Sequence, residues 1–549
     1  MNPFMRLLII LLFASFSSVG QKLKKADKVV ITNLQAHITY LADDKLEGRR
    51  AGSNGEKLAS EYISSEFQKA GLEPKGEKGW LQPFEIYDGK QINASTLLFI
   101  NDRELKLHDE YFPFVFCPGA SIEAAVSPAV KETGVPWFTD LKDIIEDNKE
   151  NPHFDITNAI KTMANKVAGK GATALFVYNS SAIADELKFD AKDNSQPLTI
   201  PVVYLTAKAC KQYLADESAT LDLKLKTAIS DKKRTGHNVI GYINNGAPAT
   251  IVIGAHYDHL GYGEDGNSLL RTAEKQVHNG ADDNASGTAA LIELARSLKL
   301  SKDKNNNYVF IAFSGEELGL FGSKYFTEHP TIELQSVNYM INMDMIGRLN
   351  DSSKTITVGG YGTSPAWGNV FTALSKQKYF TVKYDSSGVG PSDHTSFYLK
   401  NIPVLFFFTG LHSDYHKPTD DAGKINYTGE LFIIKYIESL VTQTNTKGKL
   451  TFQKTREPAT TTTARFSVTL GIMPDYTFSG NGVRIDGVSD GRPAQKAGLQ
   501  TGDIIVQLGT FDTNSLEAYM QALGRFHKGD KTTVKYKRGP DTKEGNVEF

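Results

Sequence analysis

Five side chains of metal-binding type lie between residues 256 and 416, and each stands at or beyond the end of an apolar run or just before a helical segment. His256 ends the apolar run 251–255, and Asp344 ends the run 339–343. The remaining three candidates are Asp283, one residue of the pair Glu316 and Glu317, and His416. Two histidines and three carboxylates suit a borderline metal ion such as zinc. If one carboxylate bridges two ions, each ion gains three protein ligands and a water can lie between them.

Two further carboxylates have the placement that a hydrolytic site needs. Adjacent residues on an extended or turning segment point in different directions, so one of Glu316 and Glu317 can bind metal while its neighbour faces the substrate as a base. Asp258 follows His256 by two residues and is placed to hold the imidazole N–H. Each residue alone is common in polar loops, and residues 282–284 could simply cap a helix. Their joint occurrence in one region favours a metal site.

The surrounding segments predict the elements that position these side chains. Apolar runs of strand length occupy residues 238–243, 250–256, 308–313, 337–343 and 403–408. Helical patterns occupy residues 289–300, 319–327, 365–376 and 428–444. This alternation predicts an α/β fold with a mixed, largely parallel sheet and helices on both faces. The carboxyl ends of such strands form the ligand crevice of an open sheet, which would bring the five candidates together.

Composition narrows the class of protein. A chain of 549 residues suggests about three or four domains. Lys and Arg total 61 against 63 for Asp and Glu, a near balance that argues against a nucleic-acid partner. Two cysteines exclude a disulfide scaffold and a cysteine-based zinc module. Cys117 and Cys210 could form a disulfide bond in an oxidising compartment or remain as free thiols, and the sequence leaves both possibilities open.

Residues 1–20 have the order of a secretory signal peptide. Arg6 precedes an apolar run at 7–13, and small residues follow it. The run is too short to span a bilayer as a stable helix, so we expect no transmembrane anchor. The prediction is a protein exported to the periplasm or the cell exterior, cleaved near residues 20–21.

The order of the motifs resembles the co-catalytic zinc aminopeptidases of metallopeptidase family 28. The resemblance is carried by His-Tyr-Asp at 256–258, Gly-Ala-Asp-Asp-Asn-Ala-Ser-Gly at 280–287, Glu-Glu at 316–317, Asn-Met-Asp-Met-Ile-Gly at 342–347 and Tyr-His at 415–416. Leu-Glu-Gly-Arg at 46–49 also resembles that family's N-terminal segment. The resemblance implies two zinc ions per chain, and the ligand types also permit other divalent transition metals.

The resemblance also implies a role for each residue. Asp283 would bridge the two ions. Glu317 and His416 would complete one site, and His256 and Asp344 the other. Glu316 matches the family's general base, and Tyr415 matches a tyrosine that steadies the tetrahedral intermediate. Asp393, in Ser-Asp-His at 392–394, resembles an element beside the family's site.

Further resemblances divide the chain into domains. The peptidase domain would cover 21–110 and 236–450, interrupted by a protease-associated-like insert at 111–235. The insert is indicated by Gly-Ala-Thr-Ala-Leu-Phe-Val at 171–177 and Ile-Pro-Val-Val at 200–203. A linker at 451–464 precedes a small β-rich domain at 465–549 that resembles a PDZ domain. Its carboxylate-binding loop would be Leu470, Gly471 and Ile472, which implies peptide C-termini as partners.

The activity that the resemblance implies is removal of N-terminal residues from peptides with a free N-terminus. Glutaminyl cyclases share the scaffold but keep one zinc, so the presence of His256 and Asp344 argues against that reaction. Carboxypeptidase relatives need a cationic pocket, and Arg271 and Arg348 lie near the motifs, so this alternative stays open. A non-catalytic peptide-binding protein is disfavoured because every ligand position is intact. The polar loop at 260–280 is expected beside the metals.

Overall fold

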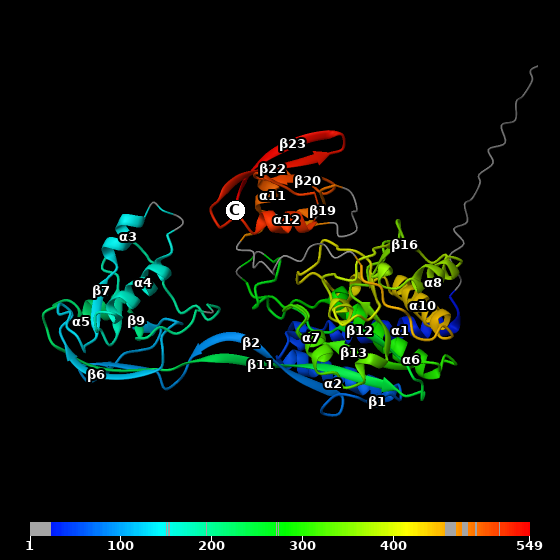
Figure 1. Cartoon of the computed structure of the whole chain (residues 1–549), viewed down its shortest axis with the longest axis horizontal. Helices are drawn as coiled ribbons and strands as arrows, with labels where there is room; N and C mark the ends of the chain where they lie inside the picture. The colour runs from blue at the N-terminus through cyan, green and yellow to red at the C-terminus, as the bar shows by residue number, and fades with distance from the viewer. Residues whose placement is uncertain are drawn as a thin grey trace, which may run out of the picture.

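The computed structural model describes residues 23–149, 151, 154–193, 195–270, 272, 274–455, 468–474, 481–488, 491–514 and 516–549. The expected signal peptide and residues 456–464 of the expected linker lie outside these ranges. Figure 1 shows a large α/β body, a second body at the far end of a two-stranded ribbon, and a smaller body formed by the C-terminal part of the chain.

The large body is built on a nine-stranded sheet with the order β1-β11-β13-β12-β14-β17-β15-β16, in which β2 also pairs with β11. The pairs β12/β13, β12/β14 and β14/β17 are parallel, whereas β11/β13 and β15/β17 are antiparallel. The predicted mixed, largely parallel sheet is therefore confirmed. The strands are β1 (Glu73–Pro74), β2 (Leu81–Ile92), β11 (Ile229–Ile243), β12 (Thr250–His256), β13 (Asn307–Phe313), β14 (Val337–Met343), β15 (Thr355–Gly359), β16 (Thr381–Tyr384) and β17 (Val404–Phe408).

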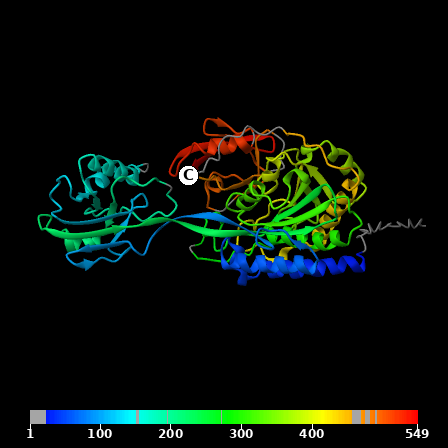
Figure 2. The ribbon, with the colours of Figure 1, turned by 60° about the horizontal axis from the view of Figure 1, so that its bottom comes forward.

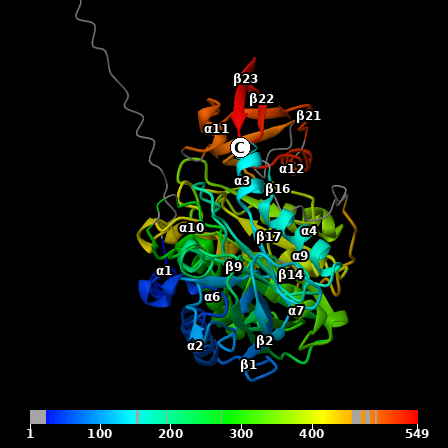
Figure 3. The ribbon, with the colours of Figure 1, turned by 90° about the vertical axis from the view of Figure 1, so that its left-hand side faces the viewer.

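Helices cover both faces of this sheet (Figure 3). One face packs on α1 (Lys25–Leu41), α2 (Asn54–Lys69), α6 (Gly287–Leu300), α8 (Ala366–Leu374) and α10 (Tyr427–Thr444). The other face packs on α7 (Phe321–Glu328) and α9 (His394–Tyr398). Along β12, Ile251 and Ile253 enter the first core while Val252 enters the second. This alternation explains why the strand is apolar throughout.

The ribbon consists of β2 and β11, which pair in antiparallel register from Val239 with Leu81 to Ile229 with Ile92 (Figure 2). The body at its end has a sheet of order β4-β3-β10-β6 and another of order β5-β9-β8-β7. Its elements are β3 (Leu97–Ile100), β4 (Arg103–Glu104), β5 (Tyr111–Pro113), β6 (Ala120–Val126), β7 (Trp137–Asp140), α3 (Lys142–Asn148), α4 (Ile156–Ala168), β8 (Leu175–Tyr178), β9 (Val202–Leu205), α5 (Ala207–Tyr213) and β10 (Leu221–Thr227).

This body, which we call the insert, has hydrophobic cores of its own. Its strands begin with β3, which pairs with β10, so the sheet includes residues upstream of the expected start at 111. Cys117 and Cys210 both lie in the insert and are free thiols, so the structure favours the unpaired alternative. Burial raises the pKa of Cys117 to about 11. The assignment of residues 111–235 as protease-associated-like stays a prediction.

The C-terminal body also has a separate core, to which Leu470, Ile505 and Val534 contribute. Its elements are β18 (Ile472–Pro474), β19 (Val483–Val488), α11 (Pro493–Lys496), β20 (Ile504–Leu508), β21 (Phe511–Asp512), α12 (Leu516–Leu523), β22 (Lys531–Arg538) and β23 (Asp541–Glu548). The expected carboxylate loop lies at the start of β18. Gly471 has φ +79° there, and a Cβ at this position would lie 2.2 Å from Cβ of Arg492, so the turn requires glycine.

The described residues also form five short helices, namely η1 (Asp44–Arg49), η2 (Ala281–Ser286), η3 (Leu334–Ser336), η4 (Tyr361–Thr363) and η5 (Ala422–Lys424). Within the part of the chain that the structure describes, no helix combines the length and the apolar character needed to cross a membrane.

Candidate active site

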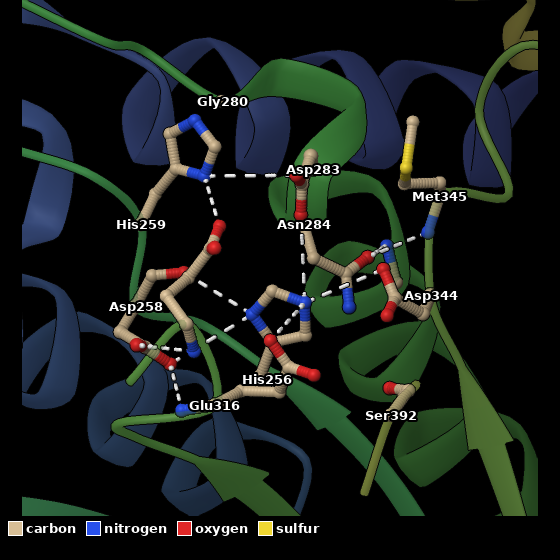
Figure 4. Close-up of polar contacts among 12 residues, drawn as sticks. His256, Asp258, His259, Gly280, Asp283, Asn284, Glu316, Asp344, Met345 and Ser392 are labelled. Atoms are coloured by element: carbon tan, nitrogen blue, oxygen red, sulfur yellow. Dashed lines mark hydrogen bonds and ion pairs between the residues drawn. The ribbon is translucent and has the colours of Figure 1, made fainter. Parts of the chain in front are cut away.

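The five candidate ligands come from different elements and meet at one edge of the nine-stranded sheet. His256 is the last residue of β12, and Asp344 directly follows β14. Asp283 lies in η2, in front of α6. Glu317 follows β13 after a short turn, and His416 stands in the loop after β17. Figure 4 shows the ring of His256 joined by dashed lines to Asp283 and to Asp344. The carboxyl edge of the parallel strands thus gathers these side chains, as expected for an open α/β sheet.

One group of ligand atoms surrounds His256. Its Nε2 lies 3.5 Å from Oδ1 of Asp283 and 3.3 Å from Oδ1 of Asp344. Two ligands of one tetrahedral zinc ion lie about 3.3 Å apart when each bond is about 2.0–2.1 Å long. Among the described residues, Oδ1 of Asp344 is buried without a hydrogen-bond partner. A buried acceptor at 3.3 Å from Nε2 of His256, with an oxygen of Asp283 also within 4.8 Å, fits a metal ion.

A second group surrounds His416. Its Nε2 lies 3.3 Å from Oδ2 of Asp283 and 3.2 Å from Oε2 of Glu317. Its Nδ1 donates to the backbone oxygen of Asn267 at 2.9 Å, which leaves Nε2 as the ligand atom. Asn267 belongs to the polar loop at 260–280, which therefore contacts the site as expected. The two carboxylate oxygens of Asp283 face different histidines, so this residue joins the two groups.

Asp258 connects two of the segments that form the site. Its carboxylate accepts the backbone N–H of Glu316 at 3.2 Å and of Glu317 at 3.4 Å. Its own backbone oxygen lies 3.2 Å from Nδ1 of His256, closer than its carboxylate at 3.7 Å. Asp258 therefore orients the imidazole mainly through its main chain and fixes the Glu316–Glu317 turn through its side chain.

Glu316 and Tyr415 line a cavity of about 400 Å³ at the site. Burial raises the pKa of Glu316 well above its usual value. The Tyr415 ring stacks on His416 with centroids 3.9 Å apart. Much of the remaining wall is apolar and includes Val389, Phe406, Phe408 and Leu411.

A carboxypeptidase needs a cationic pocket to bind the terminal carboxylate of its substrate. The described residues that line the cavity include no Lys or Arg. Arg348 pairs with Asp414 at 3.0 Å and does not line the cavity. Arg271, the other candidate, lies outside the described residues. Asp393 precedes α9 and is fully buried, and burial raises its pKa to about 7.

Three residues that the sequence analysis left without a role hold the site together. Arg49 is fully buried and donates to the backbone oxygens of Tyr257, Asn279 and Gly280, and also of Leu41. These hydrogen bonds connect the residue that follows β12 with the segment that precedes η2.

The second is Asp420, whose Oδ2 accepts the backbone N–H of Asp282 at 2.9 Å and of Asp283 at 3.1 Å. The third is His259, whose Nδ1 lies 2.8 Å from Oε1 of Glu317. Arg49 already belonged to a motif of the resemblance, and His259 was visible as a histidine three residues after His256. Nothing in the sequence singled out Asp420.

The sheet and the two ligand groups at its carboxyl edge define an α/β protein with a candidate dinuclear metal site. Residues 238–441 match peptidase family M28, and residues 451–549 match the PDZ domain family. The chain therefore contains a peptidase family M28 domain followed by a PDZ domain.

Individual relatives are more distant. Aminopeptidase YwaD of Bacillus subtilis (strain 168) is 28% identical over 278 residues, which cover 48% of this chain and 55% of the relative. Leupeptin-inactivating enzyme 1 of Streptomyces exfoliatus is 29% identical over 215 residues, which cover 38% of this chain and 44% of the relative. The chain thus spans about half the length of these relatives. A solved aminopeptidase from Aneurinibacillus sp. strain AM-1 aligns with 22% identity and a TM-score of 0.42, over 78% of this chain and 96% of that one.

Proposed function

We propose that this protein is an exported aminopeptidase that uses two zinc ions to hydrolyse N-terminal residues from peptides. The observation that carries the proposal is the position of Asp283, whose two oxygens face His256 and His416 at 3.5 and 3.3 Å. Asp344 and Glu317 complete the two groups. The M28 domain and the names of relatives such as aminopeptidase YwaD support the same activity.

The proposed chemistry assigns a task to each side chain of the cavity. When bound, two zinc ions supply a water of lowered pKa and polarise the scissile carbonyl. The Glu316 carboxylate takes the proton of that water and delivers it to the leaving amine. The Tyr415 hydroxyl donates a hydrogen bond to the oxygen on which negative charge develops. Asp258 keeps Glu316 in place through the backbone, because it accepts the N–H of that residue.

The substrate is proposed to bind with its free α-amine against the carboxylates of Asp344 and Glu316. A positive amine compensates negative charge there, whereas a blocked N-terminus does not. The apolar wall around Phe406 and Phe408 favours an apolar first side chain. A carboxypeptidase-type or glutaminyl-cyclase-like reaction on the same scaffold is the alternative.

The test uses purified mature protein with added zinc and two versions of one peptide, with a free or an acetylated N-terminus. Mass spectrometry would follow the products over time. We expect stepwise loss of N-terminal residues from the free peptide alone. Cleavage of the acetylated peptide, C-terminal shortening or cyclisation of an N-terminal glutamine would contradict the assignment. A sample treated with a chelator and then reloaded with zinc is the control for metal dependence.

We further propose that the PDZ domain binds peptide C-termini through Leu470, Gly471 and Ile472. A long peptide with a free C-terminal carboxylate should then have a lower KM than the same peptide with a C-terminal amide. In a chain that lacks residues 453–549, the two peptides should have equal KM values. Equal values in the full chain would exclude a substrate-holding role. Export is checked by sequencing the N-terminus of the mature protein, expected near residue 21.

A further inference from the structure

A third histidine lies inside the cluster of ligands and has no role in the mechanism above. The side chain of His259 is fully buried. Its Nδ1 lies 2.8 Å from Oε1 of Glu317 and 3.9 Å from Oδ2 of Asp283. Figure 4 shows its ring directed toward Asp283. His259, Asp283 and Glu317 together form a group of ligand-type atoms within 4.8 Å of one another.

The distances separate two roles for this ring. Two ligands of one zinc ion lie about 3.3 Å apart, a spacing that Glu317 Oε2 keeps with His416 at 3.2 Å. The 2.8 Å between His259 and Glu317 is shorter and matches a hydrogen bond to a charged acceptor. The 3.9 Å to Asp283 is longer than the ligand spacing. Glu317 therefore offers one oxygen to His416 and the other to a donor.

The surroundings of the ring indicate which nitrogen carries its proton. Among the described residues, Nε2 of His259 is buried without a hydrogen-bond partner. A proton on that atom would be a buried donor without an acceptor, so a neutral ring carries its proton on Nδ1. This proton then points at Oε1 of Glu317.

Close packing fixes the ring in this orientation. The backbone N–H of His259 donates to the oxygen of Arg49 at 3.2 Å. Gly280 has φ +56°, and a Cβ there would lie 2.5 Å from Cδ2 of His259. The glycine therefore makes room for the ring.

We infer that His259 is a positioning residue for the second metal site. Its Nδ1–H holds Oε1 of Glu317 and leaves Oε2 to share an ion with His416. The inference rests on the proposed function, because it assumes that this group binds zinc. Loss of a hydrogen-bond partner behind a metal ligand weakens metal binding by about 10–100-fold. One of the two zinc ions should therefore bind that much more weakly without the donor.

Two substitutions distinguish a donor from a ligand. His259→Asn places an amide N–H near the position of Nδ1, whereas His259→Leu removes the donor. Zinc dissociation constants would be measured by competition with a chromophoric chelator. We expect His259→Leu to weaken the binding of one of the two zinc ions by about 10–100-fold. The dissociation constants of His259→Asn should stay close to those of the wild-type protein. His37→Asn is the matched control, since His37 is also buried but lies on α1, where it contacts Tyr62 and Glu293.

The outcomes are distinct from those of the proposed function. Equal loss in the Asn and Leu variants would make His259 a ligand and overturn the inference, and unchanged affinity in the Leu variant would overturn it too. Circular dichroism of each variant, compared with the His37→Asn control, separates local loss of zinc from global unfolding. If the wild-type protein binds two zinc ions but cleaves no peptide, the proposed function fails while the zinc measurements still test His259. If it does not bind two ions, both fail.

Discussion

The substitution Glu316→Gln replaces the proposed base by an amide of the same shape. Oε2 of Glu316 lies 3.9 Å from Nε2 of His256, farther than the 3.5 and 3.3 Å of Asp283 and Asp344. The residue is therefore not expected to bind metal, and both ions should remain. A general base contributes about 10²–10⁴-fold to the rate, which corresponds to about 2.7–5.4 kcal/mol at 1.36 kcal/mol per tenfold.

The assay compares kcat on a chromogenic leucine substrate with zinc content measured by mass spectrometry of the metal. We expect kcat to fall by about 10²–10⁴-fold while two zinc ions per chain remain. Asp344→Asn is the matched control, because it should lose zinc together with activity. A Glu316→Gln variant that keeps kcat within about tenfold of the wild-type value would refute the base assignment. Loss of zinc from this variant would instead make Glu316 a ligand.

Three further predictions concern metal binding and stability. The Asp283→Asn variant should lose both zinc ions on gel filtration, because the substitution removes the charge of the residue shared by the two ligand groups. If two ions remain bound, another residue must bridge them. Although burial opposes the effect, nearby carboxylates raise the pKa of His256 and of His416 well above 6.5. The contribution of these contacts to the free energy of unfolding is fully present below about pH 6.5. It is lost as the pH rises through the raised pKa values of the two histidines. The melting temperature of metal-free protein should therefore fall as pH increases above neutrality, and zinc should remove this dependence; a flat profile without metal would contradict the reasoning. Arg49→Met leaves several backbone oxygens without a charged donor and should lower the free energy of unfolding by about 3–5 kcal/mol in urea titrations, whereas a loss below about 1 kcal/mol would show that water replaces the guanidinium.

The sequence was sufficient to predict the central sheet because its strands are buried on both faces. Such strands appear as unbroken apolar runs, and β12 and β14 begin and end where expected. The side chains that follow them could then be placed at one edge from topology alone. The β2/β11 ribbon was not predicted, because its pairing joins segments far apart in the chain and each strand mixes buried with exposed residues.

The missed site residues have a similar explanation. His259 lies an odd number of residues from His256, so strand alternation would place it on the opposite face. The strand ends at His256, however, and the chain turns so that His259 reaches Glu317. Asp420 acts on backbone N–H groups of η2, and this contact depends on loop geometry that residue types do not specify.

The ribbon also constrains how the peptidase domain folds. Ile92 and Ile229 pair at its far end, so the whole insert is one continuous segment that connects two paired strands. Closing a flexible loop of this length costs about 3 kcal/mol more chain entropy than closing a short hairpin. If the insert folds first around its own cores, it brings the two ends together and removes most of this cost. Mutations that unfold the insert should therefore slow the folding of the catalytic sheet while leaving every residue of the active site unchanged.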